Sequence, residues 1–291
     1  MIPVRAGGGK PAPVAGAQAS PGVEDEVLRF WILVLLLCDA LLAARPATAA
    51  GEAVPAALAR EAARYAAEPV ELKAAPVLSP VVPALVSHGS RRERLVALTF
   101  DACATRQPSG YDAALVQVLL ATRTPATFFL GGKWMLEHPE ATRRLASEEL
   151  FEIGNHGFLH RHLTQLDDAA VQQELSWTQT VMVSLTGRQG RLVRAPYVEI
   201  DERVARICAQ MGLTLVQCDL ASGDPDPALS AERLRRHVVG AARNGSIVVM
   251  HVNGRGRRTA EALPGIVAGL REKGFELVTV GEMLRRSAGA P

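Results

Sequence analysis

Two histidines four residues apart, His156 and His160, follow a short apolar run that ends in a glycine and an asparagine. On a helical turn this spacing places both imidazoles on one face, where they can hold one divalent metal ion. Zinc, cobalt and nickel all accept imidazole, so the pair alone does not select the metal. A histidine pair that binds nothing is the alternative interpretation of the same spacing. His162 is either a spare ligand or a solvated neighbour.

Further polar residues stand directly after continuous apolar runs. Asp101, Arg194 and His251 each follow one, and the segment 219–224 carries a carboxylate at both ends. In a parallel barrel, catalytic groups gather where the strands end. The set suits hydrolysis of an acyl bond, because a metal polarises the carbonyl and a water molecule while a carboxylate takes the proton of that water. In this scheme Asp101 is the base, and His251 protonates the leaving amine.

The elements that must position these residues begin at residue 95. Strands are expected over residues 95–100, 126–130, 151–153, 192–193, 213–218, 246–250 and 275–280. Helices are expected over residues 112–120, 131–150, 168–185, 202–211 and 231–243, with Asp167 or Asp168, Asp201 and Ser230 as N-caps. Continuous apolar strands that alternate with helices indicate a parallel sheet buried on both faces. Seven such units in about 190 residues favour a barrel over an open sheet.

The amino-terminal part of the chain has a different composition. Residues 29–50 place a basic residue before a short apolar run and small residues after it, which is the layout of a secretory signal peptide. The run is short for a stable membrane span, which needs about 20 apolar residues. We therefore expect a leader and signal peptide over 1–50, an Ala/Pro-rich linker or strap over 51–94, and one catalytic domain over 95–291. The protein is expected to be periplasmic or secreted, or membrane-tethered if the leader stays uncleaved.

Composition and cysteine spacing narrow the class of protein. The formal net charge of +2 gives no indication of a nucleic-acid partner, and the 4% of aromatic residues argues against long sugar-stacking platforms. The four cysteines, Cys38, Cys103, Cys208 and Cys218, form no CxxC pattern and are too few for a disulfide scaffold. We expect no disulfide between Cys208 and Cys218.

Five motifs, in order, carry a resemblance to the polysaccharide deacetylase family with the NodB homology domain, carbohydrate esterase family 4. They are Thr-Phe-Asp-Ala-Cys at 99–103, His-Gly-Phe-Leu-His at 156–160, Arg-Ala-Pro-Tyr at 194–197, a loose Asp-bearing loop at 219–225 and Val-Met-His at 249–251. The resemblance covers roughly residues 95–284. It implies a distorted (β/α) barrel that removes acetyl groups from an N- or O-acetylated glycan with the help of a divalent metal.

The family roles carry over to matching positions in this chain. The resemblance implies that Asp101 is the general base and His251 the general acid. Arg194 would keep Asp101 ionised, and Asp224 would orient His251. The backbone N–H of Tyr197 would face the oxyanion. Arg194 could instead be a structural ion-pair partner, and Asp224 a turn residue.

The first motif departs from the family pattern at the metal site. The resemblance implies that His156 and His160 hold the metal, with zinc expected, but the aspartate that supplies the third ligand in the family is Ala102 here. A methyl group cannot bind a metal. Asp101, a water molecule or the thiolate of Cys103 could complete the shell, and Cys103 could equally be a small buried hydrophobe. Two alternatives to a metal-assisted deacetylase therefore remain: a metal-independent amidase on the same barrel, and a non-catalytic glycan-binding pseudoenzyme.

Overall fold

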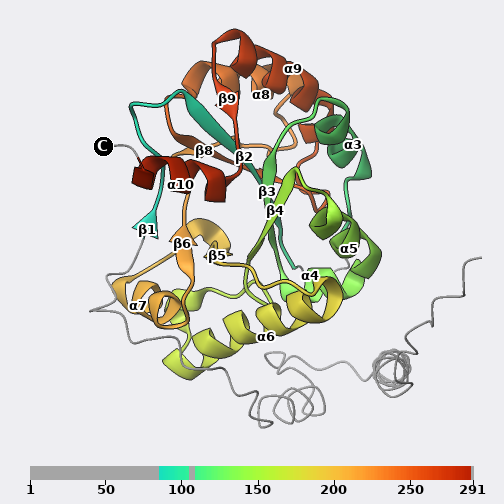
Figure 1. Cartoon of the computed structure of the whole chain (residues 1–291). Coiled ribbons are helices and arrows are strands. Elements are labelled where there is room, and N and C mark those ends of the chain that lie inside the picture. The colour runs from blue at the N-terminus through green and yellow to red at the C-terminus, as the bar shows by residue number, and fades with distance from the viewer. Residues whose placement is uncertain (1–84, 105–108, 290–291) are drawn as a thin grey trace, which may run out of the picture. The chain divides into compact units, whose positions relative to one another are not determined.

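The computed structural model describes residues 85–104 and 109–289 (Figure 1). The chain divides into two compact units, residues 1–68 and 69–291, and every described residue belongs to the second unit. The leader expected over 1–50 and most of the segment expected as a linker or strap over 51–94 lie outside the described residues.

A single parallel sheet forms the centre of the described unit (Figure 1). Its strands are β1 (Leu85–Val86), β2 (Leu95–Ala102), β3 (Ala126–Leu130), β4 (Phe151–Asn155), β5 (Leu192–Val193), β6 (Thr214–Val216), β7 (Leu220–Ala221), β8 (Ser246–His251) and β9 (Glu276–Leu277). Their order is β1-β6-β5-β4-β3-β2-β8-β7, and β9 pairs with the start of β2. The sheet curls into part of a barrel, which confirms the expected distorted parallel α/β barrel.

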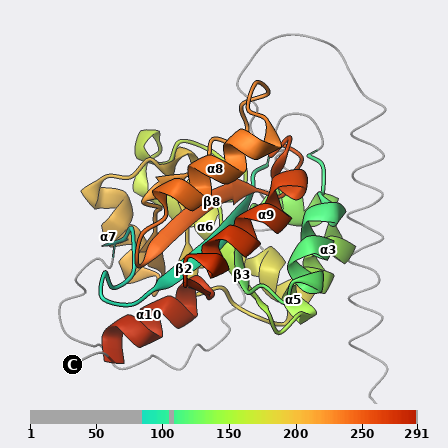
Figure 2. The ribbon, with the colours of Figure 1, turned by 90° about the horizontal axis from the view of Figure 1, so that it is seen from above.

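The helices lie around this sheet (Figures 1 and 2). They are α3 (Ala113–Ala121), α4 (Gly132–Glu137), α5 (Pro139–Ser147), α6 (Asp168–Thr186), α7 (Glu202–Gln210), α8 (Ala231–Ala241), α9 (Thr259–Glu272) and α10 (Val280–Gly289), with 3₁₀ turns at Leu163–Gln165 and Pro196–Val198. Helix α9 packs against α3 and α8, and α6 packs against α4, α5 and α7. Among the helices described, none is both long enough and apolar enough to cross a bilayer.

Several elements differ from the sequence-based expectation. Strands β1 and β7 and helix α10 were not expected, and the strand expected over 213–218 covers only Thr214–Val216. The single helix expected over 131–150 is two helices, because Pro139 begins a new one after His138. The strand expected over 275–280 is reduced to Glu276–Leu277, because Val280 already begins α10. Helix α9 was not predicted at all, since Pro264 interrupts its sequence pattern.

Side chains alternate between the two faces of β2. Leu95 and Ala97 pack inside the curled sheet with the α10 residues Val280 and Met283. The backbone N–H of Val280 donates to Thr127 near the start of β3, so α10 lies at the amino end of the strands. The carboxyl ends of the strands are left for the polar residues of the candidate site.

Candidate active site

His156 and His160 lie on a loop after β4 and not on the helical turn that we expected. The loop turns through positive φ angles at Gly157 (71°) and His160 (57°). It still brings the two imidazoles together, with ring centroids 5.0 Å apart. The spacing of four residues therefore predicted the pairing correctly but for the wrong reason. A glycine is suited to position 157, since L-residues adopt that φ rarely.

Buried hydrogen bonds hold this loop from two sides. The Asn155 side chain accepts a hydrogen bond from the N–H of Gly157 (2.9 Å) and donates to the carbonyl of Leu175 on α6 (2.9 Å). Glu174, also on α6, accepts from the N–H groups of Phe158 and Leu159, both at 2.9 Å. The first turn of α4 adds its own N–H groups, which donate to the carbonyls of residues 157 and 158. The loop is thus fixed before any ligand binds.

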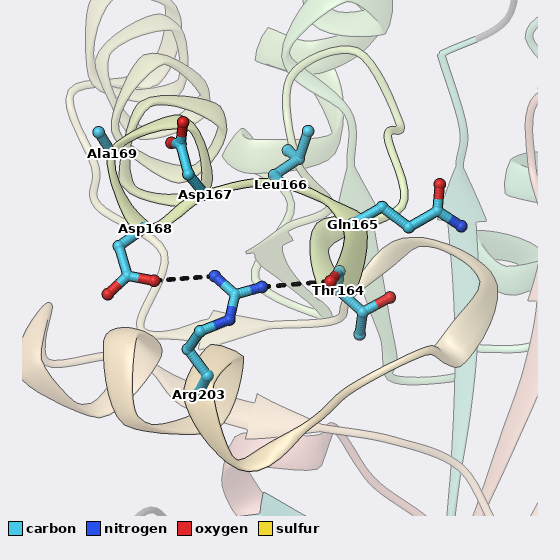
Figure 3. A pocket seen from close by; sticks show the side chains of 7 residues that line it. All are labelled: Thr164, Gln165, Leu166, Asp167, Asp168, Ala169 and Arg203. Carbon is cyan, nitrogen blue, oxygen red and sulfur yellow. Dashed lines mark hydrogen bonds and ion pairs between the residues drawn. The ribbon is translucent and has the colours of Figure 1, made fainter.

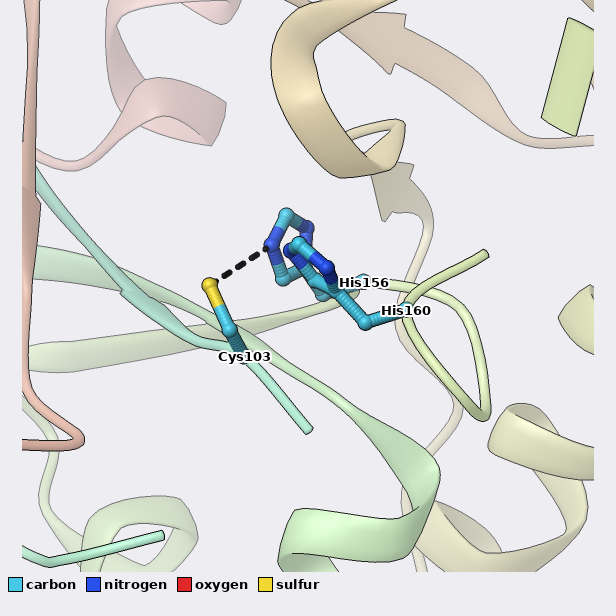
Figure 4. A group of neighbouring side chains, drawn as sticks. All are labelled: Cys103, His156 and His160. Carbon is cyan, nitrogen blue, oxygen red and sulfur yellow. Dashed lines mark hydrogen bonds between the residues drawn. The ribbon is translucent and has the colours of Figure 1, made fainter. Parts of the chain in front are cut away.

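The side chain of Cys103 points toward the imidazoles of His156 and His160 (Figure 4). Its sulfur lies 3.6 Å from Nε2 of His156, and the ligand atoms of Cys103, His156 and His160 all lie within 4.8 Å of one another. All three residues are buried. Burial raises the pKa of the Cys103 thiol, but hydrogen bonds to His156, His160 and His251 outweigh it and lower the pKa to about 4.

The donor set of this cluster fits a zinc-class ion. Nδ1 of His156 lies 2.9 Å from the carbonyl oxygen of Arg194, an acceptor that fixes the proton on Nδ1 and leaves the lone pair of Nε2 for a metal. The Nε2–Sγ separation of 3.6 Å equals the edge of a zinc tetrahedron, about 3.6 Å for Zn–S and Zn–N bonds of about 2.3 and 2.0–2.1 Å. Two imidazoles and a thiolate are ligands that zinc prefers.

Asp101 is buried at the end of β2 and is paired with Arg194. One carboxylate oxygen accepts from Nη1 of Arg194 at 2.8 Å, and the other lies 3.8 Å from Nε2 of His156. Burial alone would raise the pKa of the Asp101 carboxyl, but the charges of Arg194, His156 and His251 outweigh it and hold the pKa below its ordinary value. The carboxylate is therefore ionised and lies next to the histidine pair.

Arg194 itself is fully buried and held in one orientation. Its guanidinium also donates to the hydroxyl of Thr99 (2.7 Å) and to the carbonyl of Gln217 (3.1 Å), and it lies over the ring of Phe129 at 4.2 Å. Such a cation is stabilised only by partners that match its geometry. Arg194 thus supplies a fixed positive charge in direct contact with the Asp101 carboxylate.

His251 at the end of β8 has a carboxylate partner of its own. Its Nδ1 lies 2.9 Å from Asp224, and its backbone N–H donates to the second oxygen of the same carboxylate at 2.8 Å. Asp224 is further fixed by the hydroxyls of Ser222 (3.2 Å) and Thr259 (2.7 Å). Burial lowers the pKa of His251, but Asp224 and Cys103 outweigh it and raise the pKa to about 10. The imidazole is therefore protonated at neutral pH.

The register of the sheet brings the Asp101–Arg194 pair next to the His251–Asp224 pair. Asp101 of β2 is the direct neighbour of His251 on the parallel strand β8. Sequence analysis placed Asp101, His156, His160, Arg194 and His251 at strand ends, and the structure brings all five side chains into one cluster. Asp224 joins the cluster through His251.

Tyr197 lies at the rim of this cluster. Both Tyr197 (φ 60°) and Val198 (φ 59°) adopt the left-handed conformation, which is rare for non-glycine residues. The side chain of Gln217 donates to the carbonyl of Val198 and so supports this turn. The half-exposed Tyr197 ring stacks on His162 at 3.8 Å and meets His160 edge-on at 4.6 Å. His162 therefore packs against Tyr197 and does not belong to the cluster of possible metal ligands, which is Cys103, His156 and His160.

A shallow depression of about 680 Å³ lies elsewhere, and its lining contains none of the clustered residues (Figure 3). Residues 164–169 and Arg203 line it. The Arg203 guanidinium spans it, with hydrogen bonds to Asp168 (2.9 Å) and the carbonyl of Thr164 (3.3 Å). The Arg203 cation is therefore already paired within the depression.

Among the supporting residues that sequence reasoning missed are Thr99, Glu174 and Thr259. A signal existed for two of these three. Thr99 shares the face of Asp101 on an alternating strand. Glu174 is a charged residue on the mainly apolar stripe that α6 buries, between Val171 and Leu175. Thr259 gave no signal, because its contact with Asp224 joins segments 35 residues apart.

Comparison with known proteins agrees with this arrangement. Residues 88–216 match the sequence model of the family described as polysaccharide deacetylase. This part of the chain resembles that family. The matched residues contain Asp101, both histidines of the pair, Arg194 and Tyr197.

Several known proteins resemble this chain. The chain is 27% identical over 201 residues to the peptidoglycan-N-acetylmuramic acid deacetylase PdaA of Bacillus subtilis, covering 67% of this chain and 73% of PdaA. The PdaA structure, a family 4 carbohydrate esterase, superimposes with a TM-score of 0.63 at 25% identity, over 69% of this chain and 85% of the other. A bifunctional xylanase/deacetylase of Pseudobutyrivibrio xylanivorans is 24% identical over 69% of this chain, which spans 32% of that longer protein.

A further structure shares the fold alone. It is a pseudoenzyme of carbohydrate esterase family 4 from Bacillus anthracis, with a TM-score of 0.63 at 22% identity over 69% of each chain. The shared fold therefore occurs with and without activity, and the chemistry of this chain has to be argued from its own residues.

Proposed function

We propose that this chain is a hydrolase that removes acetyl groups from an N-acetylated, or O-acetylated, glycan. The observation that carries the proposal is the sheet register, which places Asp101, paired with Arg194, beside His251, paired with Asp224, next to a cluster that can hold a metal. The lowered pKa of Asp101 and the raised pKa of His251 suit a base and an acid, which a binding protein does not need. The relative PdaA is a peptidoglycan deacetylase, so an N-acetylated cell-wall glycan is the first substrate to test.

In the proposed reaction, Asp101 accepts the proton of the attacking water. Arg194 keeps the carboxylate ionised until the proton is transferred. His251 donates its proton to the leaving nitrogen, and Asp224 stabilises the imidazolium until then. When bound, a divalent metal, with zinc expected, supplies a Lewis acid for the acetyl carbonyl and the water.

Tyr197 takes the remaining role in this proposal. Its backbone N–H would donate to the oxyanion that forms on the acetyl carbonyl. The turn at Tyr197 and Val198 supports this role, because strained backbone persists where the surrounding structure holds it in place, as Gln217 does here. A donor fixed in advance needs no reorganisation when the charge develops.

Acetate release from purified, zinc-loaded protein tests the proposal. The substrates would be peptidoglycan fragments, chitin oligosaccharides and an O-acetylated glycan. We expect acetate from at least one of them and a loss of about 10²–10⁴-fold in the Asp101→Asn variant, the usual contribution of a general base. Glycan binding without acetate from any substrate would favour the glycan-binding alternative. Activity that survives both chelation and His156→Ala would favour a metal-independent amidase.

We also propose that the protein acts outside the cytoplasm. The basic, apolar and small-residue order of residues 29–50 supports this location. The mature protein is expected to start near Ala50 or Gly51, which amino-terminal sequencing of the exported protein would check. Recovery of only the full-length chain, and only from the cytoplasm, would contradict it.

A further inference from the structure

We propose that Cys103 is the third protein ligand of the metal, so that the site is built from one sulfur and two nitrogen atoms. The thiolate then replaces the carboxylate that the family pattern places at position 102. This inference rests on the proposed function, because it concerns the metal that would assist the same hydrolysis. It assigns a role to a residue for which the family pattern provides none.

The geometry of the cluster carries the first step. The Cys103 sulfur lies 3.6 Å from Nε2 of His156, and His160 completes a set whose ligand atoms are all within 4.8 Å. Cys103 is only 2% exposed, yet its sulfur faces the imidazoles of His156 and His160. A cysteine that merely filled the core would have apolar neighbours, as Cys208 does among the side chains between α6, α7 and β6.

The backbone explains why the side chain of Cys103 reaches the cluster. Side chains alternate along an extended chain, so Cys103 falls on the same side as Asp101. Cys103 is also anchored, because its carbonyl accepts hydrogen bonds from the side chains of Ser109 and Asn253, both at 2.9 Å. Its sulfur is therefore held in place before a metal binds.

A sulfur ligand leaves Asp101 free. Its carboxylate already accepts from Arg194 at 2.8 Å, and a base that also bound the metal would lose proton affinity. With Cys103 as the ligand, binding and proton transfer fall to different residues. Thiolate also selects for soft ions, so the site should favour zinc and cobalt over magnesium, calcium or manganese.

Cobalt substitution of the purified full chain tests the ligand directly. A thiolate bound to Co(II) gives a near-ultraviolet charge-transfer band, which imidazole, carboxylate and water ligands do not give. We expect this band in the wild type, in Asp101→Asn and in the matched control Cys218→Ser. We expect it to be absent from Cys103→Ser. Loss of a residue that only orients a metal ligand typically lowers metal affinity by roughly 10–100-fold. Zinc affinity should fall by more than this in Cys103→Ser, because a ligand itself is lost.

A second measurement keeps the inference testable if Cys103→Ser fails to fold. Wild-type protein would be alkylated with and without zinc, and each cysteine would be followed by peptide mapping. We expect zinc to protect Cys103 selectively, while the reactivity of Cys218 stays the same. A charge-transfer band that persists in folded Cys103→Ser, or alkylation of Cys103 unaffected by zinc, would overturn the inference. Neither readout depends on turnover, so failure of the proposed deacetylase activity would be recognised separately by the acetate assay.

Discussion

Two carboxylates in this site receive opposite tasks from their surroundings. Asp101 is paired with the fixed cation Arg194 and remains available on its other oxygen. Asp224 is occupied on both oxygens by His251, Ser222 and Thr259, so it can only stabilise and orient. Different environments can give two carboxylates of one site different roles at the same pH.

The Asp224→Asn variant tests the orienting carboxylate. Asparagine keeps the size of the side chain but removes the negative charge that favours the imidazolium of His251. We expect kcat to fall by about 10²–10⁴-fold with little change in KM, because substrate contacts are untouched. Asp226→Asn, an exposed position on the same loop, is the control and should keep wild-type kinetics. A rise in KM with unchanged kcat would instead assign Asp224 to substrate binding.

At the residue scale, the sequence predicted those functional groups that end apolar strands. Asp101, Arg194 and His251 were found because parallel strands deliver such residues to one edge. The hydrogen bonds that hold Cys103 in place could not be predicted. Its carbonyl accepts from Asn253, which is 150 residues away, and from Ser109 in the following loop.

At the scale of elements, two helices clamp the loop that carries His156 and His160. N–H groups at the start of α4 donate to its carbonyls, and Glu174 of α6 accepts from two of its own N–H groups. The ring of Phe158 packs against Trp177 of α6 as well, with centroids 5.4 Å apart. The strands were predictable because their apolar runs are continuous, whereas this clamp depends on how α4 and α6 pack.

Glu174 variants test the clamp. Glu174→Ala leaves the N–H groups of Phe158 and Leu159 buried without acceptors, at a cost of about 1–3 kcal/mol each. We expect lower stability and about tenfold weaker zinc binding, because the loop no longer presents both imidazoles. Glu174→Gln keeps a carbonyl oxygen for both bonds and should bind zinc nearly as the wild type does. Denaturant midpoints and zinc titrations measure the two effects, and equal zinc affinity in all three proteins would argue against the clamp.

The same residue gives a pH dependence with a definite sign. Burial raises the pKa of Glu174, and the N–H groups of Leu159 and Phe158 and the charge of Arg161 only partly oppose it. The folded state therefore holds this proton more tightly than the unfolded state. Its stabilising contribution is present below the unfolded pKa, about 4.3, and is lost as the pH rises through the folded pKa. The stability of the wild type relative to Glu174→Gln should fall over that window. Urea unfolding of both proteins across it measures the difference, and a rise would contradict the sign.

At the scale of the described unit, apolar packing and the polar cluster lie at opposite ends of the curled sheet. Helix α10 and the apolar interior occupy the amino ends of the strands, where Met283 packs with Leu95 and Ala97. The polar cluster occupies the carboxyl ends. The parallel barrel was predictable from alternating apolar strands and helices. Its incomplete closure was not, because several strands have only two or three residues, and their pairing is set by packing and not by pattern.

The segment before β2 extends the sheet beyond the boundary that we expected at residue 95. β1 pairs with β6, and the N–H of Gly89 donates to the carbonyl of Gly245 at 2.8 Å. Arg91 donates to the carbonyl of Asn244 and forms an ion pair with Asp219 at 2.8 Å. Residues 85–94 therefore act as a strap along the loop before β8 and the edge of β6.

Two shortened chains test the strap. A variant beginning at residue 95 exposes the edge of β6 and leaves Asp219 without Arg91, so we expect it to be less stable than a variant beginning at residue 85. The loss should be about 1–3 kcal/mol, since the ion pair is partly exposed and adds little to the few backbone hydrogen bonds. Arg91→Ala in the longer variant isolates the ion pair and should cost no more than about 1 kcal/mol. Because the strap contains none of the three proposed metal ligands, zinc affinity should be the same in both chains. Urea midpoints that coincide for the two chains would show that the stable domain begins at residue 95 after all.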